Sequence, residues 1–133
     1  MKFSILSMVT GALAVSLSYD NTYDNAGLSL DSVACSDGAN GLITKGYSTL
    51  GSLPNFPYVG GAPAVSGWNS MACGSCWQLS YNGKSIYVLA VDAAPGGFNV
   101  AEAAMNALTN NQAAALGRIE VSSTEVASSF CKM

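Results

Sequence analysis

The residues most able to do chemistry are gathered in one pentapeptide, Cys73-Gly74-Ser75-Cys76-Trp77. Its letters match the C-G-[SA]-C-[WY] pattern that surrounds the nucleophilic cysteine of one class of cysteine proteases. A thiol nucleophile of that kind needs an imidazole to take its proton and return it to the leaving group. The chain has no histidine, so the sequence excludes Cys-His catalysis.

The same stretch is also a C-x-x-C motif, which is typical of redox dithiols and of zinc sites. A redox dithiol depends on a helix N-terminus that lowers the pKa of one thiol, whereas the residues after Cys76 alternate as in a strand. Zinc requires further cysteine or histidine ligands, and Cys35 and Cys131 are isolated. We therefore expect structural cysteines, no metal site and no cofactor.

The N-terminal residues predict export to an oxidising compartment. Lys2 precedes an apolar run, and Ala12-Leu13-Ala14 is a small-x-small cleavage signature. The run is too short to span a bilayer. We therefore predict a signal peptide over 1–14, a mature domain over 15–133 and an extracellular or cell-wall location, where disulfides persist.

Four cysteines allow three pairings. A Cys73–Cys76 bond would close a very tight loop and leave the other two cysteines to pair alone. Pairing Cys35 with Cys73 and Cys76 with Cys131 closes two long loops, each worth about 4 kcal/mol in the chain-entropy model. The long-loop pairing is therefore preferred.

Composition limits the partners. Five basic residues stand against eight acidic ones, for a net charge of −3, and only 10% of the residues are charged. Such a chain lacks the basic surface that nucleic acid requires and the basic helix face used at anionic membranes. A neutral surface rich in hydroxyls and amides suits hydrogen bonding to an uncharged polymer.

The pattern of apolar residues predicts short strands with helices confined to one crossover. Asn82-Gly83 is a strong hairpin signal, and Asn99 with Glu102 forms a capping box. The residues over 48–67 read as a long irregular loop. The expected strands are 15–20, 42–47, 77–81, 85–91 and 118–123, and the expected helices are 100–108 and a short one from Thr109 to Gly117. This arrangement predicts a small barrel rather than a parallel sheet.

Asp92 is the leading candidate site residue, because it ends an apolar strand just before a Pro/Gly turn. Its carboxylate is expected either to project into a groove or to cap loop amides. Hydrolysis of a glycoside normally takes two carboxylates, and no spacing singles out a second one. The other candidates are Asp20, Asp24, Asp37 and Glu102.

Aromatic and amide side chains offer further ligand contacts. Tyr19, Tyr47 and Tyr81 present rings either to sugar faces or to the core. Asn99 is expected to cap its helix, to bind ligand, or to do both. The two tryptophans adjoin the cysteines, which favours the core over an exposed platform; they are Trp68 and Trp77.

Several long motifs follow one another along the whole mature chain. They read V-S-L-S-Y-D-x-x-Y-D from Val15, C-S-D-G-x-N-G-L-I-T-K-G-Y from Cys35, G-W-N-S-x-x-C-G-x-C-W from Gly67, V-D-x-x-P-G-G-F-N-V-A from Val91 and L-T-N-N-Q-A-x-x-L-G-R-I from Leu108. Together they resemble the cerato-platanin family of secreted fungal proteins. Asn110-Asn111 departs from the expected Gly-bearing turn, and the tail Cys131-Lys132-Met133 also departs from the pattern.

The resemblance implies a mainly β fold, a six-stranded double-ψ β-barrel like the first domain of expansins, with Cys35–Cys73 and Cys76–Cys131 bridges. It also implies a shallow groove for chitin or N-acetylglucosamine oligomers, expansin-like loosening of cell-wall polysaccharide without hydrolysis, and recognition at a plant surface receptor as an elicitor of defence. We predict a carbohydrate-binding protein with no catalytic residues. Its predicted ligand-binding residues are Asp92, Asn99, Tyr19 and Tyr47.

Two alternatives stay open at this point. One is a weak endoglucanase-like hydrolase that uses Asp92 as its acid. The other is a surface-active protein that associates with itself at interfaces, as hydrophobins do. Neither reading involves nucleic acid or membrane insertion.

Overall fold

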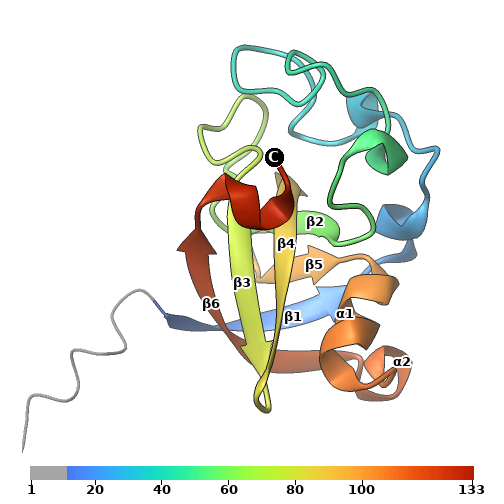
Figure 1. The fold of residues 1–133 in the computed structure, drawn as a ribbon, viewed down its shortest axis with the longest axis vertical. Helices are drawn as coiled ribbons and strands as arrows, with labels where there is room; N and C mark the ends of the chain where they lie inside the picture. Colours follow the sequence, from blue (N-terminus) through green and yellow to red (C-terminus); the bar gives the residue numbers. More distant parts are fainter. Residues whose placement is uncertain (1–11) are drawn as a thin grey trace, which may run out of the picture.

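A computed structural model describes residues 12–133 and folds them as a closed six-stranded β-barrel with short helices outside it (Figure 1). The predicted signal peptide therefore lies, apart from 12–14, outside the described residues. In chain order the strands and helices are β1 (Leu13–Tyr19), η2 (Asn21–Asp24), η3 (Leu30–Ser32), η4 (Leu50–Ser52), β2 (Val59–Ala62), β3 (Cys76–Tyr81), β4 (Lys84–Ala93), β5 (Phe98–Val100), α1 (Glu102–Thr109), α2 (Ala113–Leu116), β6 (Arg118–Val126) and η5 (Ser128–Cys131).

The strands close in the order β1-β5-β2-β4-β3-β6. The pairs β1–β5 and β2–β4 are parallel, and the other pairs are antiparallel. Inward residues of neighbouring strands fill the interior, among them Leu17, Leu79 and Leu89, each fully buried. The prediction of a mainly β, six-stranded barrel with few short helices is confirmed. In the part of the chain that the structure describes, no helix has the length and apolar character needed to cross a membrane.

The β3–β4 hairpin is formed as its sequence predicts. Asn82 and Gly83 take φ values of 47° and 82°, as a two-residue type I′ turn requires. Tyr81 pairs with Lys84 beside the turn. In β4 the run from Val88 to Val91 is buried on both faces, which confirms that this strand is central.

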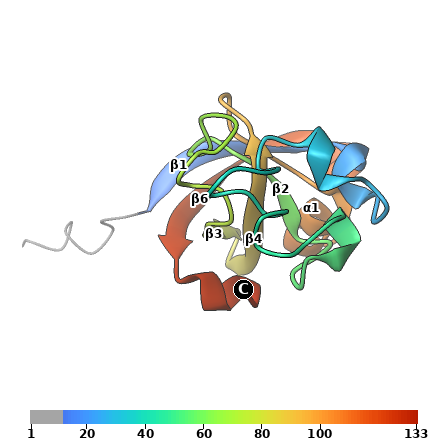
Figure 2. The ribbon, with the colours of Figure 1, turned by 90° about the horizontal axis from the view of Figure 1, so that it is seen from above.

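The long segment between β1 and β2 covers one end of the barrel (Figures 1 and 2). It contains little regular structure, yet it is fixed by fully or nearly fully buried leucines: Leu30, Leu42, Leu50 and Leu53. Burial of each leucine side chain stabilises the fold by roughly 1.5–3 kcal/mol relative to exposure. The strand predicted over 42–47 is wrong, because the backbone forms successive turns there, with Lys45 N–H donating to the Leu42 carbonyl.

Strand β2 lies inside the stretch predicted to be an irregular loop. Its sequence is V-G-G-A, and glycine pairs are read as turns by local rules. Here the glycines permit close approach of strands: a Cβ at Gly60 would lie 2.5 Å from the Val100 Cα. Packing between β2 and β5 therefore accounts for these residues better than turn formation does.

The predicted capping box is wrong. Asn99 is the central residue of β5, and α1 begins at Glu102 after an N-cap residue, Ala101, that makes no side-chain cap. The cap comes from Asp24, whose carboxylate accepts from the backbone N–H groups of Glu102 (2.8 Å) and Ala103 (3.0 Å). An anion at this position also favours the helix dipole.

The second helix is shorter than predicted. Thr109 is the last residue of α1, and its hydroxyl donates to the Met105 carbonyl over 2.8 Å. Helix α2 therefore starts only at Ala113. Its end at Gly117, where φ is 72°, is as predicted.

Both predicted disulfides are present. Cys35 is bonded to Cys73 and Cys76 to Cys131, with sequence separations of 38 and 55 residues. The first bridge ties the covering loops to the segment before β3. The second ties the start of β3 to η5. The described residues contain no free cysteine.

Candidate functional site

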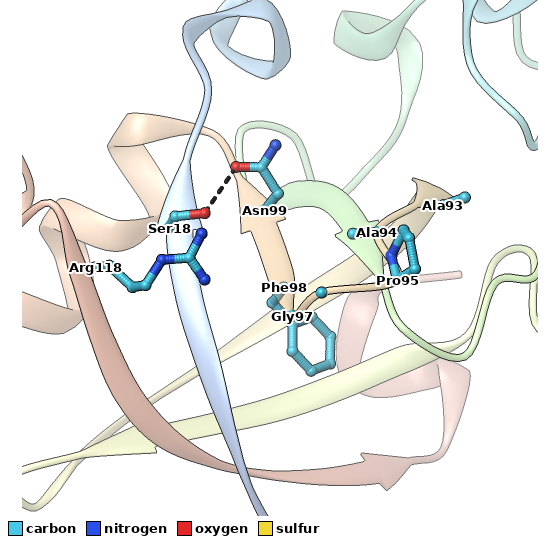
Figure 3. A pocket seen from close by; sticks show the side chains of 9 residues that line it. Ser18, Ala93, Ala94, Pro95, Gly97, Phe98, Asn99 and Arg118 are labelled. Atoms are coloured by element: carbon cyan, nitrogen blue, oxygen red, sulfur yellow. Dashed lines mark hydrogen bonds between the residues drawn. The ribbon is translucent and has the colours of Figure 1, made fainter.

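A polar groove of about 330 Å³ lies beside the turn between β4 and β5. Figure 3 shows the side chains of Ser18, Arg118 and Asn99 close together, with Ala94 and Pro95 of the turn to their right. Its volume is at the low end of the range of small-ligand sites. The lining residues are Ser18, Ala93, Ala94, Pro95, Gly96, Gly97, Phe98, Asn99 and Arg118.

Three polar residues and one glycine, from four neighbouring strands, lie in one row beside this groove. Ser18 pairs with Asn99, Asn99 with Gly61, and Gly61 with Asp92. A bulge between Gly60 and Gly61 shifts the register and brings Asp92 opposite Gly61. The glycine keeps this part of the row free of a side chain.

Asn99 is the predicted ligand residue that lines the groove. The Ser18 hydroxyl donates to its Oδ1 over 3.1 Å, which orients the amide. Its Nδ2 has no hydrogen-bond partner among residues 12–133. The half-buried Asn99 therefore presents two N–H donors to a ligand.

Asp92 lies next to the groove with its carboxylate already occupied. Oδ1 accepts from the backbone N–H groups of Ala34 and Ala93, both at 2.9 Å. Oδ2 accepts from the Tyr23 hydroxyl at 2.8 Å. Burial of Tyr23, followed by its hydrogen bond to the carboxylate, raises the pKa of the phenol well above its usual range. The structure therefore shows Asp92 in the amide-capping role considered for it, with one lone pair of Oδ2 left.

The two tyrosines predicted to bind ligand do not line the groove. Tyr19 and Tyr47 are half-buried and pack against the hydrophobic core, as Tyr81 does. Trp77 also packs on the core and makes an edge contact with Phe98 at 5.7 Å.

Trp68 differs from its prediction. It is 63% exposed, and its indole N–H donates to Asp37 over 2.6 Å. The prediction of a core position for Trp68 is therefore wrong. This tryptophan is held at the surface by an acid and is not packed in the interior.

The remaining candidate acids also have structural partners. Asp20 caps η2 by accepting from the Thr22 N–H, and Glu102 accepts from the Asn21 amide over 2.8 Å. Asp24 caps α1 and Asp37 holds Trp68. No aspartate or glutamate of the described residues lines the groove.

Sequence reasoning missed two residues of the groove, Ser18 and Arg118. Arg118 opens β6 directly after Gly117, and its guanidinium donates to the Ser16 hydroxyl over 2.9 Å. Ser16 in turn donates to the Gly96 carbonyl over 3.0 Å. The available signal is that Arg118 is the chain's single arginine, but nothing local indicates that the start of β6 pairs with Ser18 of β1, the strand next to β5.

The family model described as Cerato-platanin matches residues 15–133. A protein named cerato-platanin from Ceratocystis fimbriata f. sp. platani is 50% identical, over 90% of this chain and 87% of that protein. The crystal structure of cerato-platanin 3 from M. perniciosa superposes with a TM-score of 0.88 at 53% identity, covering 91% of this chain and all of that one. The solution structure of a protein described as the fungal elicitor Cerato-Platanin gives a TM-score of 0.79 at 46% identity, over 88% and 96% of the two chains.

A more distant likeness concerns the fold alone. An expansin from Clavibacter michiganensis, crystallised with cellohexaose, superposes with a TM-score of 0.60 at 17% identity. The match covers 87% of this chain and 50% of the expansin chain. The barrel is thus shared with an expansin domain, as the sequence motifs predicted.

Proposed function

Because the chain belongs to the cerato-platanin family, we propose that it is a secreted, non-catalytic protein that binds N-acetylglucosamine oligomers of chitin in the groove beside β5. The observation that carries the proposal is the groove's chemistry. Its lining offers an amide, a hydroxyl and a guanidinium, with no carboxylate among the described lining residues. Such groups bind and orient sugar hydroxyls and acetamido groups through hydrogen bonds, without providing an acid and a base.

The proposed contacts follow from the free donors and acceptors. The Asn99 Nδ2 donates to a sugar hydroxyl or an acetamido carbonyl, and the Ser18 hydroxyl fixes the Asn99 amide. The apolar surfaces of Pro95 and Gly96, both exposed, support a sugar face. Each neutral hydrogen bond contributes about 0.5–1.5 kcal/mol, so about three of them predict weak binding, with a Kd on the order of millimolar or weaker.

Asp92 has a supporting part in this proposal. Its three hydrogen bonds hold the covering loop at Ala34 and the aromatic ring of Tyr23 against the end of β4. The Pro95–Gly97 turn that borders the groove starts from this fixed point. The sequence-based prediction that Asp92, Tyr19 and Tyr47 contact the ligand directly is tested by single substitutions at these positions, each followed by titration with the oligomer.

Titration of the folded protein with N-acetylglucosamine oligomers and with cellohexaose tests the proposal. NMR chemical shifts should change first at the amides of Ser18, Asn99 and the Pro95–Gly97 turn. Asn99→Ala should weaken binding by about fivefold to tenfold, the equivalent of roughly 1–1.4 kcal/mol. Ser122→Ala, on the exposed face of β6, is the matched control and should leave affinity unchanged. Shift changes confined to another face would overturn the assignment of the site.

Analysis of reaction products distinguishes a hydrolase from a protein that only binds the sugar. Glycoside hydrolysis normally takes a pair of carboxylates across the scissile bond, and Asp92 is committed to three donors. We expect no new reducing ends from chito- or cello-oligomers after prolonged incubation. Release that disappears in Asp92→Asn would instead support the enzyme.

Loosening of cell-wall polysaccharide and elicitation of plant defence are the wider activities that we propose. They rest on membership of the family and on the relative described as a fungal elicitor. In this proposal the same groove holds a polysaccharide chain away from its neighbours, without breaking covalent bonds. A plant surface receptor and self-association at interfaces are further proposed partners that binding and light-scattering experiments test.

A further inference from the structure

We propose that the groove prefers an oligosaccharide that carries a carboxylate, a uronate unit within an otherwise neutral chain, through the guanidinium of Arg118. The inference rests on the proposed function, because it uses the same groove, and it adds the chemical class of one unit of the ligand.

A chain of two hydrogen bonds links Arg118 to β1 and to the turn between β4 and β5. Its NH1 donates to the Ser16 hydroxyl on β1 (2.9 Å), and Ser16 donates to the Gly96 carbonyl in the turn (3.0 Å). Gly97 approaches Ser16 so closely that a Cβ there would collide with the Ser16 backbone carbonyl, 2.7 Å away. The arginine, the serine and the turn therefore form one tethered unit.

Most donors of the guanidinium are left for a ligand. The group has five N–H donors in a planar fork, and Ser16 is its only hydrogen-bond partner among residues 12–133. Figure 3 shows the guanidinium beside Ser18, on the side of the groove where Asn99 lies. A carboxylate is the ligand group that matches this fork with two parallel hydrogen bonds.

Among the residues that the structure describes, Arg118 is also the single charged residue that lines the groove. The nearest acid on its own strand face is Glu120, which pairs with Ser16 and does not line the groove. The chain as a whole carries a net charge of −3, so a uniform polyanion is repelled at long range. A local cation on an acidic protein therefore selects isolated carboxylates on a neutral chain.

Three probes with one backbone test the inference: the N-acetylglucosamine tetramer, the same tetramer with a single C6 hydroxyl oxidised to a carboxylate, and the methyl ester of that acid. At low ionic strength the acid should bind about threefold to tenfold more tightly than its ester, a modest factor because the pair is exposed. The advantage should shrink toward onefold in about 1 M salt. Calorimetric or NMR titration measures the two affinities, whose quotient is the acid-to-ester ratio.

Two variants with the same change of charge locate the effect. Arg118→Gln should bring the acid-to-ester ratio close to one, whereas Lys45→Gln, at an exposed position outside the groove, should leave the ratio unchanged. If Arg118→Gln melts at a lower temperature than the parent, Arg118→Lys supplies the second test, since it keeps the charge, loses the fork and should retain part of the ratio.

The outcomes separate this inference from the proposed function. Equal binding of acid and ester, or a ratio that survives in Arg118→Gln, overturns the uronate preference and leaves the groove as a neutral sugar site. Absence of binding by all three probes overturns the proposed function and the preference with it.

Discussion

The Tyr23 hydroxyl donates a hydrogen bond of 2.8 Å to Oδ2 of Asp92, 69 residues further along the chain. This contact joins the first turn after β1 to the end of β4. Asp92 also holds the backbone N–H of Ala34, one residue before the Cys35–Cys73 bridge. A single carboxylate thus connects three separate segments at the end of the barrel, next to the groove.

The contact predicts how stability depends on pH. The pKa of Tyr23 is raised in the folded state, whereas an unfolded tyrosine titrates near about 10. The stabilisation is therefore complete below about pH 10 and is lost as the pH rises above it, by up to about 1.4 kcal/mol per pH unit. Urea unfolding between about pH 8 and pH 11 measures this slope.

Tyr23→Phe is the variant for this test. It should lower the free energy of unfolding by about 1–2 kcal/mol near pH 7, because it leaves Oδ2 of Asp92 without its donor, and it should flatten the alkaline slope. Tyr81→Phe is the matched control and should keep the slope. An identical slope in parent and Tyr23→Phe would contradict the role of this contact.

The two disulfides are expected to supply much of the stability. Loops of 38 and 55 residues each restrict the unfolded chain by about 4 kcal/mol in the entropy model, against a total of roughly 5–15 kcal/mol for a domain. Reduction should therefore unfold the domain or nearly so, as thermal melting with and without reductant would show.

The two disulfides can also be removed one at a time. Each double cysteine-to-serine variant should lower the free energy of unfolding by about 2–4 kcal/mol. A melting temperature that changes by only a few degrees on full reduction would mean that the core is sufficient without the bridges. Non-reduced peptide mapping that joins Cys73 to Cys76 would contradict the pairing itself.

Helix α1 is capped by Asp24, whereas local sequence rules assign the cap to Asn99, and a substitution at each residue distinguishes the two assignments. Asp24→Ala removes the acceptor for the N–H groups of Glu102 and Ala103, and loss of an N-cap costs about 0.5–2 kcal/mol. We expect the melting temperature to fall by roughly 2–8 °C. Asn99→Ala, the substitution that a capping box would make costly, should leave the helix intact by circular dichroism. A larger loss of helix stability in Asn99→Ala than in Asp24→Ala would instead support the capping box.

This difference shows what the sequence could and could not predict. Some signals between residues close in sequence predict the structure correctly, such as the Asn82-Gly83 turn and the stop of α2 at Gly117, whereas the equally local capping box of Asn99 and Glu102 does not form. The capping box misplaces Asn99 because the position of this residue is set by pairing with Ser18 of β1 and Gly61 of β2, which lie 81 and 38 residues away. The glycines of β2 were read as turn residues for the same reason, since their purpose is close packing against Val100.

The residues of the groove show the same difference between local signals and long-range pairing. Asp92 was found because an acid at the end of an apolar strand is a local pattern, but its three hydrogen-bond partners come from the fold. Arg118 and Ser18 were missed because β6 and β1 pair across about 100 residues of sequence. The family motifs gave the barrel and the disulfides, yet they did not indicate which side chains meet in the groove.

Asp92→Asn distinguishes two roles of the Asp92 carboxylate: holding the covering loop by hydrogen bonds, and contacting the ligand. The asparagine can keep its oxygen toward the N–H groups of Ala34 and Ala93 and turn its amide to Tyr23, whose hydroxyl then accepts. Hydrogen bonds to a charged acceptor are worth about 1.5–3 kcal/mol and neutral ones about 0.5–1.5, so the fold should persist with about 1–2 kcal/mol less stability. Affinity for the N-acetylglucosamine oligomer should stay within about twofold of the parent. Tenfold weaker binding with an unchanged melting temperature, equivalent to about 1.4 kcal/mol, would instead place the Asp92 carboxylate in contact with the sugar.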